Sequence, residues 1–288
     1  MEDFARRALL LKAQNPDGGW GYFPGHESWL EPTAWAALAL HGQESAARAY
    51  KLVRGWQNTD GSAGPSAGVD SPHWTASMIL TLAALRRDMP VVKRGVEYLL
   101  NTGGAESGAL MRLMYFLRPK ASDRNPNFEG WAWRAGASAW IEPTAHAITA
   151  LRLAGRLLPG DRRIQERIAS AQNFIWHQRC RDGGWNYGAR MAFEIPLHSF
   201  PETTALALVG LQGRPGLRDA VEAARKIAQG HRSPLSQAWL SLGLRLHGQD
   251  AAVDEGDSAG DDIMLCAIRT LAARDGNWPI LLAGKAGA

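Results

Sequence analysis

Three glutamates occur in a repeated sequence setting that could support proton transfer. Each follows an aromatic residue by two positions and comes two positions before a Thr-Ala pair; they are Glu31, Glu142 and Glu202. Burial raises a carboxyl pKa by up to about 3–5 units, so a buried glutamate can stay protonated and act as an acid. An aromatic ring beside it would stabilise a cationic intermediate by about 0.5–2 kcal/mol. The preceding aromatic residues are Trp29, Trp140 and Phe200.

The same glutamates also suit a structural role at the start of helices. Pro32 and Pro143 follow Glu31 and Glu142, and proline is favoured at the first helical position. The glutamates would then be capping residues, where the helix dipole favours a carboxylate by about 0.3–1 kcal/mol. That interaction lowers a carboxyl pKa, whereas a proton donor at neutral pH needs a raised one. The sequence leaves both roles open.

A fourth acid and several ring-bearing side chains extend the candidate site. Asp70 lies three residues before His73, at another expected helix start, and an Asp–His pair at this spacing could share a proton. The candidate lining residues of a substrate cavity are Trp29, Trp140, Phe200, His73, Trp74 and His146. Histidines at such positions are more often cavity-lining or hydrogen-bonded polar residues than metal ligands.

The sequence gives little support for a metal or a cofactor. Asp261 and Asp262 supply only the first half of the DDxxD-type cluster that would hold Mg²⁺ on a diphosphate. Cys180 and Cys266 lie far apart and have no Cys or His partner at ligand spacing. We therefore expect neither a metal nor a cofactor.

Internal repeats indicate which elements carry these residues. Residues 19–40 align without gaps on residues 130–151, and a shorter copy lies at 200–211. A second phrase, Gln followed by Asp-Gly-Gly-Trp or a variant of it, occurs at 14–22, 57–64 and 178–187. Asp-Gly-Gly is a turn signal because glycine adopts positive φ and ends a helix. The glutamates are therefore expected at the starts of helices that follow turns.

Between the repeated phrases the hydrophobic periodicity is that of helices. Amphipathic segments, predicted as outer helices, are 44–56, 91–100, 163–177 and 217–228. Segments richer in Ala, Leu and Thr, predicted as inner helices, are 33–41, 73–86, 107–117, 144–154, 203–212, 235–247 and 262–273. Helix pairs of this kind bury their apolar faces only by stacking. We expect one all-α domain over residues 1–288, an (α/α)6 toroid of alternating outer and inner helices.

Composition narrows the partners and the compartment. Hydrophobic residues make up 45% and charged residues 21% of the chain, so disorder is excluded as its main state. The net charge is +4 and the basic residues are scattered, which argues against nucleic-acid binding. No apolar run approaches the length of a membrane span and no signal peptide is expected, so we predict a cytoplasmic location. Peripheral membrane contact would need an exposed apolar patch, which the sequence does not locate, and the oligomeric state is left open.

These residues resemble a known superfamily. Gln14–Trp20 and Gln178–Trp185 are similar to the QW repeat of squalene and oxidosqualene cyclases. The chain as a whole resembles the superfamily that also contains protein prenyltransferase β subunits and the class II β-domain of plant diterpene cyclases. The resemblance implies an (α/α)6 toroid with a central, often apolar cavity and an isoprenoid or other apolar small molecule as its ligand.

The resemblance also suggests which residue is the acid. Squalene-type cyclases protonate an alkene with the middle Asp of an Asp-x-Asp-Asp-Thr-Ala motif, and the Thr-Ala register places Glu31, Glu142 and Glu202 at that acid. Glu142 is preferred because it lies mid-chain, as the family's motif does. The match is partial, since Pro or Thr replaces the neighbouring Asp and squalene cyclases have two toroidal domains. The stretch around Asp70 resembles the zinc-binding phrase of prenyltransferases, but Pro72 replaces the cysteine ligand.

Three functional classes follow, in this order of preference. The first is a terpenoid cyclase-like isomerase that binds an isoprenoid and protonates it. The second is a non-catalytic relative, an isoprenoid-binding or protein-interaction module with a degenerate site. The third is a carbohydrate-active enzyme on the same toroid, with Glu31 and Glu142 as acid and base.

Overall fold

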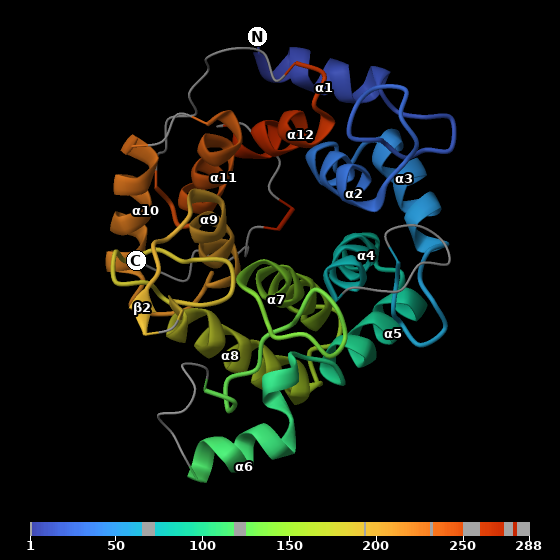
Figure 1. Ribbon diagram of the computed structural model, residues 1–288. Helices are drawn as coiled ribbons and strands as arrows, with labels where there is room; N and C mark the ends of the chain where they lie inside the picture. Colours follow the sequence, from blue (N-terminus) through green and yellow to red (C-terminus); the bar gives the residue numbers. More distant parts are fainter. Residues whose placement is uncertain are drawn as a thin grey trace.

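The protein forms a closed ring of inner helices, shown by the computed structural model in Figure 1. The structure describes residues 2–64, 73–117, 125–192, 194–230, 233–249, 260–273 and 279–280. Within these residues the inner ring has six helices: α2 (Leu30–Ala39), α4 (His73–Arg86), α7 (Ile141–Gly155), α9 (Pro201–Gly210), α11 (Pro234–Arg245) and α12 (Ile263–Ala272). Each packs against the next, and α12 packs against α2, so the ring closes. These helices are rich in Ala and Leu because they are covered on all sides; in α2 every residue except Glu31 is buried.

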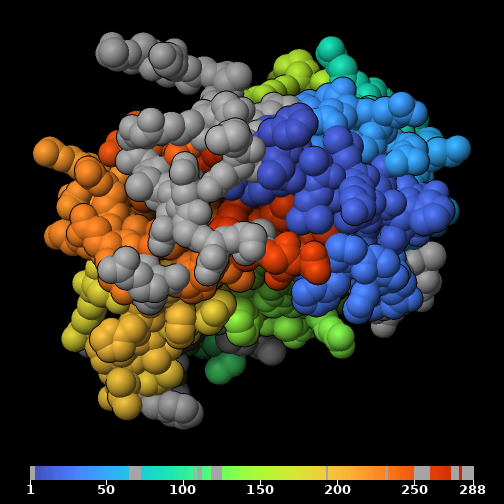
Figure 2. All heavy atoms as spheres, turned by 90° about the horizontal axis from the view of Figure 1, so that it is seen from above, coloured from blue at the N-terminus to red at the C-terminus, as the bar shows by residue number. Residues whose placement is uncertain are grey.

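Amphipathic helices cover the outside of the ring. In the described part of the chain they are α1 (Glu2–Lys12), α3 (Glu44–Arg54), α5 (Met89–Leu100), α8 (Arg162–His177) and α10 (Arg218–Gly230). Each of the last four packs against two neighbouring inner helices, as α8 does against α7 and α9. α1 packs against α12 and so joins the two ends of the ring, where the blue N-terminal helix lies beside red α12 (Figure 2). This confirms the all-α (α/α)6 toroid predicted from the sequence.

The prediction of an inner helix at 107–117 is wrong. The chain there forms a short 3₁₀ helix, η1 (Ala105–Ser107), and α6 (Ala109–Leu117), which projects from the ring (Figure 1). α4 and α7 pack directly against each other, so the ring has no room for another inner helix between them. Apolar side chains of α6 are consequently exposed, with Phe116 at 80% and Leu117 at 68%. This is the exposed apolar patch that the sequence did not locate.

A small hairpin interrupts the connection from α8 to α9. β1 (Met191–Ala192) pairs antiparallel with β2 (Ile195–Pro196), with Met191 opposite Pro196. No strand was expected here because the segment is too short to show alternation. The hairpin lies between Tyr187 and Phe200, two side chains that approach each other in the site described below.

Three tryptophans repeat one hydrogen-bond pattern at the turns that lead into inner helices. The indole N–H donates to a carbonyl in the last turn of the preceding outer helix, from Trp20 to Leu10 (2.7 Å), Trp131 to Leu99 (3.1 Å) and Trp185 to Ile175 (2.6 Å). The backbone N–H of each tryptophan donates to a threonine Oγ1 at 2.9–3.0 Å, with Thr33, Thr144 and Thr204 as acceptors. Each threonine lies two residues after a candidate glutamate. The turns therefore fix where those glutamates sit.

Close packing explains the glycine before each tryptophan. A Cβ atom at Gly130 would lie 2.7 Å from Thr144 Oγ1, and one at Gly184 would lie 2.6 Å from Thr204 Oγ1. Both distances are shorter than van der Waals contact. A side chain at these positions would push the threonine away from the tryptophan N–H that it accepts.

Candidate active site

The three glutamates lie in the first turns of inner helices, each as the second helical residue. Trp29, Trp140 and Phe200 occupy the preceding capping positions with extended backbones, at φ −117°, −127° and −116°, and none makes a side-chain capping bond. The N-cap position expected for Glu31 and Glu142 is therefore wrong, although both stay in the first turn, where the helix dipole favours a carboxylate. The helices begin at Leu30 and Ile141, which leaves the two prolines at the third position rather than the first.

Glu142 has the most strongly altered acidity of the three. Burial raises its pKa from 4.5 to about 7, and the nearby charge of Glu31 adds to the rise. His146, one turn along α7, has its Nε2 atom 4.0 Å from Glu142 Oε1. Burial lowers the pKa of His146 to about 3, so this ring is neutral and does not form an ion pair with the carboxylate. Glu142 is consequently poised to gain and lose a proton near neutral pH.

Aromatic rings from four inner helices meet around His146. Trp35 of α2 and Trp74 of α4 both make edge contacts with the His146 ring, at centroid distances of 5.4 and 5.9 Å. Trp35 also contacts Trp239 of α11 at 5.0 Å. Because α2, α7 and α11 are not neighbours in the ring, these contacts cross its centre. The indoles of Trp35 and Trp74 therefore pack against the neutral His146 ring, one helical turn along α7 from Glu142.

Glu31 is held by a tyrosine from its own turn. Tyr22 Oη donates to Glu31 Oε2 at 2.5 Å. Burial raises the pKa of Glu31, while the bond from Tyr22 opposes the rise by stabilising the carboxylate. The Tyr22 backbone carbonyl accepts from Ile263 N at 3.0 Å, which ties this turn to the start of α12. Glu31 is thus a positioned acid whose charge acts on Glu142.

Three aromatic rings, those of Trp140, Tyr187 and Phe200, form a strip between the helix start that carries Glu142 and the one that carries Glu202. Tyr187 lies between Trp140 and Phe200, at centroid distances of 6.2 and 4.9 Å. Burial raises the pKa of Tyr187, and the charges of Glu202 and Glu142 raise it further. Ser236 Oγ donates to Glu202 Oε1 at 2.5 Å. The three rings of the strip are 38–41% exposed, so they line an accessible surface beside the acids.

The remaining predicted residues do not all lie at one site in the structure. Trp74 contacts His146 and stacks on Trp133 at 6.4 Å, which places it with Glu142. His73 instead accepts from Ala132 N at 3.2 Å and contacts Tyr98, so it serves as a bonded polar residue of the wall. Trp29 Nε1 donates to Glu27 Oε1 at 3.2 Å. Asp70 lies outside the described residues.

Sequence reasoning missed Tyr22 and Tyr187, and it missed Trp35 and Trp239. A signal existed for the tyrosines, because both stand two residues after the tryptophan of a Gly-Trp-x-Tyr phrase. The two inner-helix tryptophans gave no comparable signal. Their meeting with His146 depends on closure of the ring.

The described residues include no candidate metal site and no candidate membrane span. No group of three or more His, Cys, Asp and Glu side chains in this part of the chain could hold a metal ion. None of the described helices has the length and apolar character needed to cross a membrane.

Comparisons with known proteins show the fold but no family. No protein-family model matches the chain, and neither does any curated protein sequence. Among solved structures, the type II terpene cyclase MstE from Scytonema superposes with a TM-score of 0.55 and 19% identity over 94% of this chain and 76% of that one. A protein from Actinoplanes gives 0.55 and 20% over 92% and 78%. A family 76 glycoside hydrolase from a bovine Bacteroides thetaiotaomicron strain gives 0.56 and 10% over 94% and 77%.

These structural likenesses define the fold class of the chain. The chain has a terpenoid cyclase-like (α/α)6 toroid, a scaffold that it shares with both a terpene cyclase and a glycoside hydrolase. At such identities the likeness extends to the fold alone, so activity has to be argued from the site.

Proposed function

We propose that the chain binds an isoprenoid at the acid-bearing end of the ring and isomerises it by protonation, with Glu142 as the acid. The observation that carries this proposal is the Glu142 pKa of about 7 in an aromatic setting. An acid with a pKa near the working pH is protonated often enough to act and loses its proton readily enough to be useful. MstE, whose substrate complex holds geranylgeranyl dihydroxybenzoate, adds support at the level of the fold.

The residues have distinct roles in this reaction. The π electrons of an alkene take the proton from the Glu142 carboxyl group, leaving a carboxylate and a carbocation. Trp140, Tyr187 and Phe200 stabilise the cation through their ring faces, by about 0.5–2 kcal/mol each. A carboxylate, that of Glu31 or Glu202, then takes a proton from the neighbouring carbon, and the C–H electrons re-form an alkene. That carboxyl group then loses its proton to water and Glu142 gains one from water, so atoms and charge balance over the cycle and the substrate is isomerised.

Glu31 has a second role as a positioning residue. Its charge disfavours the carboxylate form of Glu142 and so favours reprotonation after each turnover. The neutral His146 ring, with its Nε2 atom 4.0 Å from Glu142 Oε1, adds no positive charge that would favour the carboxylate form. Tyr22 keeps Glu31 in place through its short hydrogen bond.

A carbohydrate-active enzyme is the second candidate, since one observation favours it as well. Glu31 and Glu142 influence each other electrostatically, as an acid and a base on either side of a glycosidic bond would. A glycoside hydrolase is also among the proteins with a similar fold. The exposed aromatic rings of Trp140, Tyr187 and Phe200 suit an apolar ligand, and we therefore place this reading second. The non-catalytic isoprenoid-binding module has the same ligand but no chemistry.

The test is an incubation with squalene, geranylgeranyl diphosphate and shorter prenyl diphosphates, with products identified by gas chromatography–mass spectrometry. We expect a cyclised or isomerised product whose formation falls at least about 100-fold in Glu142→Gln. Product that survives this substitution would overturn the assignment of the acid. Ligand-induced stabilisation without product would favour the binding module, and sugar release from an oligosaccharide panel would favour the glycosidase.

We also propose that α6 contacts a membrane surface from which the protein collects its apolar ligand. The helix projects from the ring with Phe116 and Leu117 exposed, and Arg118, Lys120 and Arg124 follow it in the sequence. Exposed apolar side chains followed in the sequence by basic residues suit an anionic bilayer surface. Cosedimentation with vesicles of phosphatidylcholine and phosphatidylglycerol should be lost in Phe116→Asp and kept in Phe4→Asp, whose ring is 81% exposed on α1. Equal binding of the two variants, or no binding of the unaltered protein, would refute this role.

A further inference from the structure

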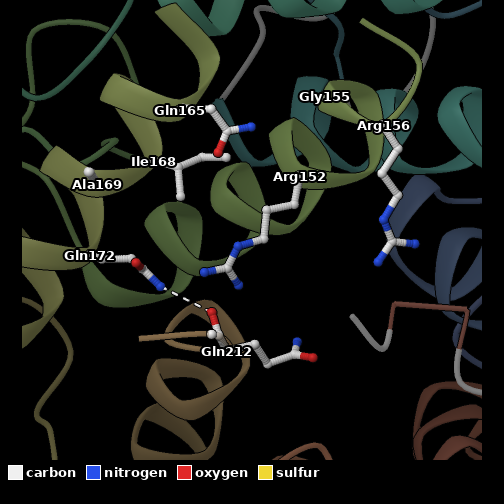
Figure 3. A pocket seen from close by; sticks show the side chains of 9 residues that line it. Arg152, Gly155, Arg156, Gln165, Ile168, Ala169, Gln172 and Gln212 are labelled. Carbon is white, nitrogen blue, oxygen red and sulfur yellow. Dashed lines mark hydrogen bonds between the residues drawn. The ribbon is translucent and has the colours of Figure 1, made fainter. Parts of the chain in front are cut away.

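A pocket of about 420 Å³ lies at the opposite end of α7 from Glu142 (Figure 3). It opens where the end of α7 faces α8 and the turn that follows α9. Its polar lining residues are Arg152, Arg156, Gln165, Gln172 and Gln212. Ten residues of helix separate Arg152 from Glu142, which corresponds to about 15 Å along the axis. The pocket is therefore separate from the carboxylates of the proposed active site.

Two guanidinium groups from one helix face this pocket. Arg152 and Arg156 are four residues apart on α7, and their side chains extend to the same side in Figure 3. Burial and the neighbouring Arg156 lower the pKa of Arg152 to about 10, so Arg152 stays cationic at neutral pH. Like charges at this spacing on a helix repel each other. The helix therefore places two positive charges side by side at the pocket.

Among the described residues, little compensates for the positive charge of Arg152. Its Nη1 atom is buried and has no hydrogen-bond partner among the described residues. The described residues that line the pocket include no carboxylate. The end of the α7 dipole favours a cation, but by only about 0.3–1 kcal/mol. Burial lowers the pKa of His247, just after α11, and the nearby charge of Arg152 lowers it further.

The glutamine wall opposite the arginines is fixed in place. Gln172 Nε2 donates to the carbonyls of Gly210 and Gln212, at 3.1 and 3.2 Å. Gln212 Nε2 donates to Val209 O at 3.0 Å. In Figure 3 the Arg152 guanidinium extends toward this wall. The cavity is preorganised, because these bonds hold its shape without a ligand.

We propose that this pocket binds a small oxyanion ligand of the phosphate or diphosphate class. A guanidinium group presents a planar fork of donors that matches phosphate oxygens, and two of them on one wall suit a ligand with several oxygens. The volume lies within the usual range of small-molecule sites. This site is independent of the proposed isomerase activity, and the anion occupies a different end of the ring from the reacting alkene.

Isothermal titration with inorganic pyrophosphate tests this site at fixed ionic strength, with sodium chloride as the competing salt. We expect saturable binding that weakens about tenfold or more in Arg152→Gln and in Arg156→Gln, since each loses charged hydrogen bonds to the ligand. Arg181→Gln, which removes the same charge from an exposed turn of the chain, is the matched control and should bind as the unaltered protein does. Equal affinity in all four proteins, or no binding to the unaltered protein, would overturn the proposal.

Thermal melting of the variants and binding to lipid vesicles separate the remaining outcomes. Arg156 is exposed, so Arg156→Gln is expected to melt like the control and to report on binding even if Arg152→Gln folds poorly. Vesicles that contain phosphatidic acid identify the source of the phosphate. Arg156-dependent cosedimentation supports a lipid headgroup as the natural ligand, and binding of pyrophosphate alone supports a soluble one. Isomerase activity in an unaltered protein that does not bind pyrophosphate would refute this pocket and leave the proposed function standing.

Discussion

Replacing Glu142 with glutamine should make the protein more stable above neutral pH and leave its stability unchanged in acid. The folded state raises the Glu142 pKa from 4.5 to about 7, so it binds this proton more tightly than the unfolded chain does. Below pH 4 the Glu142 carboxyl group is protonated in both the folded and the unfolded state, so it does not lower the free energy of unfolding. Between about pH 4.5 and 7 the free energy of unfolding falls by about 1.4 kcal/mol per pH unit, and above pH 8 the full cost remains.

The size of the effect follows from this shift. A change from 4.5 to about 7 corresponds to about 3 kcal/mol. The Glu142 side chain is 24% exposed, and solvent screening reduces the expected gain to about 2–3 kcal/mol. For a chain of this length that gain raises the melting temperature by about 4–6 °C. Glutamine keeps the shape of the side chain, so the gain reports the removed charge.

Urea unfolding of the two proteins at pH 4.5 and pH 8 measures the difference directly, since other titrating groups cancel. Glu166→Gln on the exposed side of α8 is the control, and a surface substitution of this kind should stay within about 0.5 kcal/mol at both pH values. A difference between Glu142→Gln and the unaltered protein that is the same at both pH values would refute a raised pKa. The proposed proton donor would then lose its physical basis.

Two other substitutions test the site and the turns. Tyr22→Phe removes the hydrogen bond that lowers the Glu31 pKa, so the Glu31 pKa should rise further. Glu31 is then less often charged, and the Glu142 pKa should fall. Carboxyl titration by NMR follows both pKa values, and unchanged values would disprove the coupling. Gly130→Ala should destabilise the protein by about 1–3 kcal/mol, because the new Cβ lies 2.7 Å from Thr144 Oγ1, whereas Gly160→Ala meets no atom within 4 Å and should be tolerated; equal melting temperatures would contradict the role given to the Trp131 turn.

The architecture was accessible from the sequence because it is repeated. The aligned segments 19–40 and 130–151 predicted that the same turn and helix start recur, and Trp20 and Trp131 indeed make the same bonds. Whether an apolar segment joins the ring was harder to predict, since 107–117 has the composition of a buried helix. Direct packing of α4 against α7 excludes it, and that contact depends on the whole ring.

The site was predictable only in part, for a similar reason. Repetition singled out the glutamates, but the exact start of each helix depends on how the preceding aromatic residue is held, which moved Pro32 and Pro143 to the third position. The raised pKa of Glu142 arises from burial and from Glu31 on a helix that is not its neighbour in the ring. Such long-range effects leave no local pattern in the sequence.

The most direct test of the central claim is product formation from an isoprenoid in D₂O. If Glu142 protonates the alkene, its exchangeable site carries deuterium, and the product of the unaltered protein gains one deuterium at the protonated carbon. Glu142→Gln should form almost no product. An unlabelled product, or labelled product that Glu142→Gln forms at an undiminished rate, would contradict Glu142 as the proton donor.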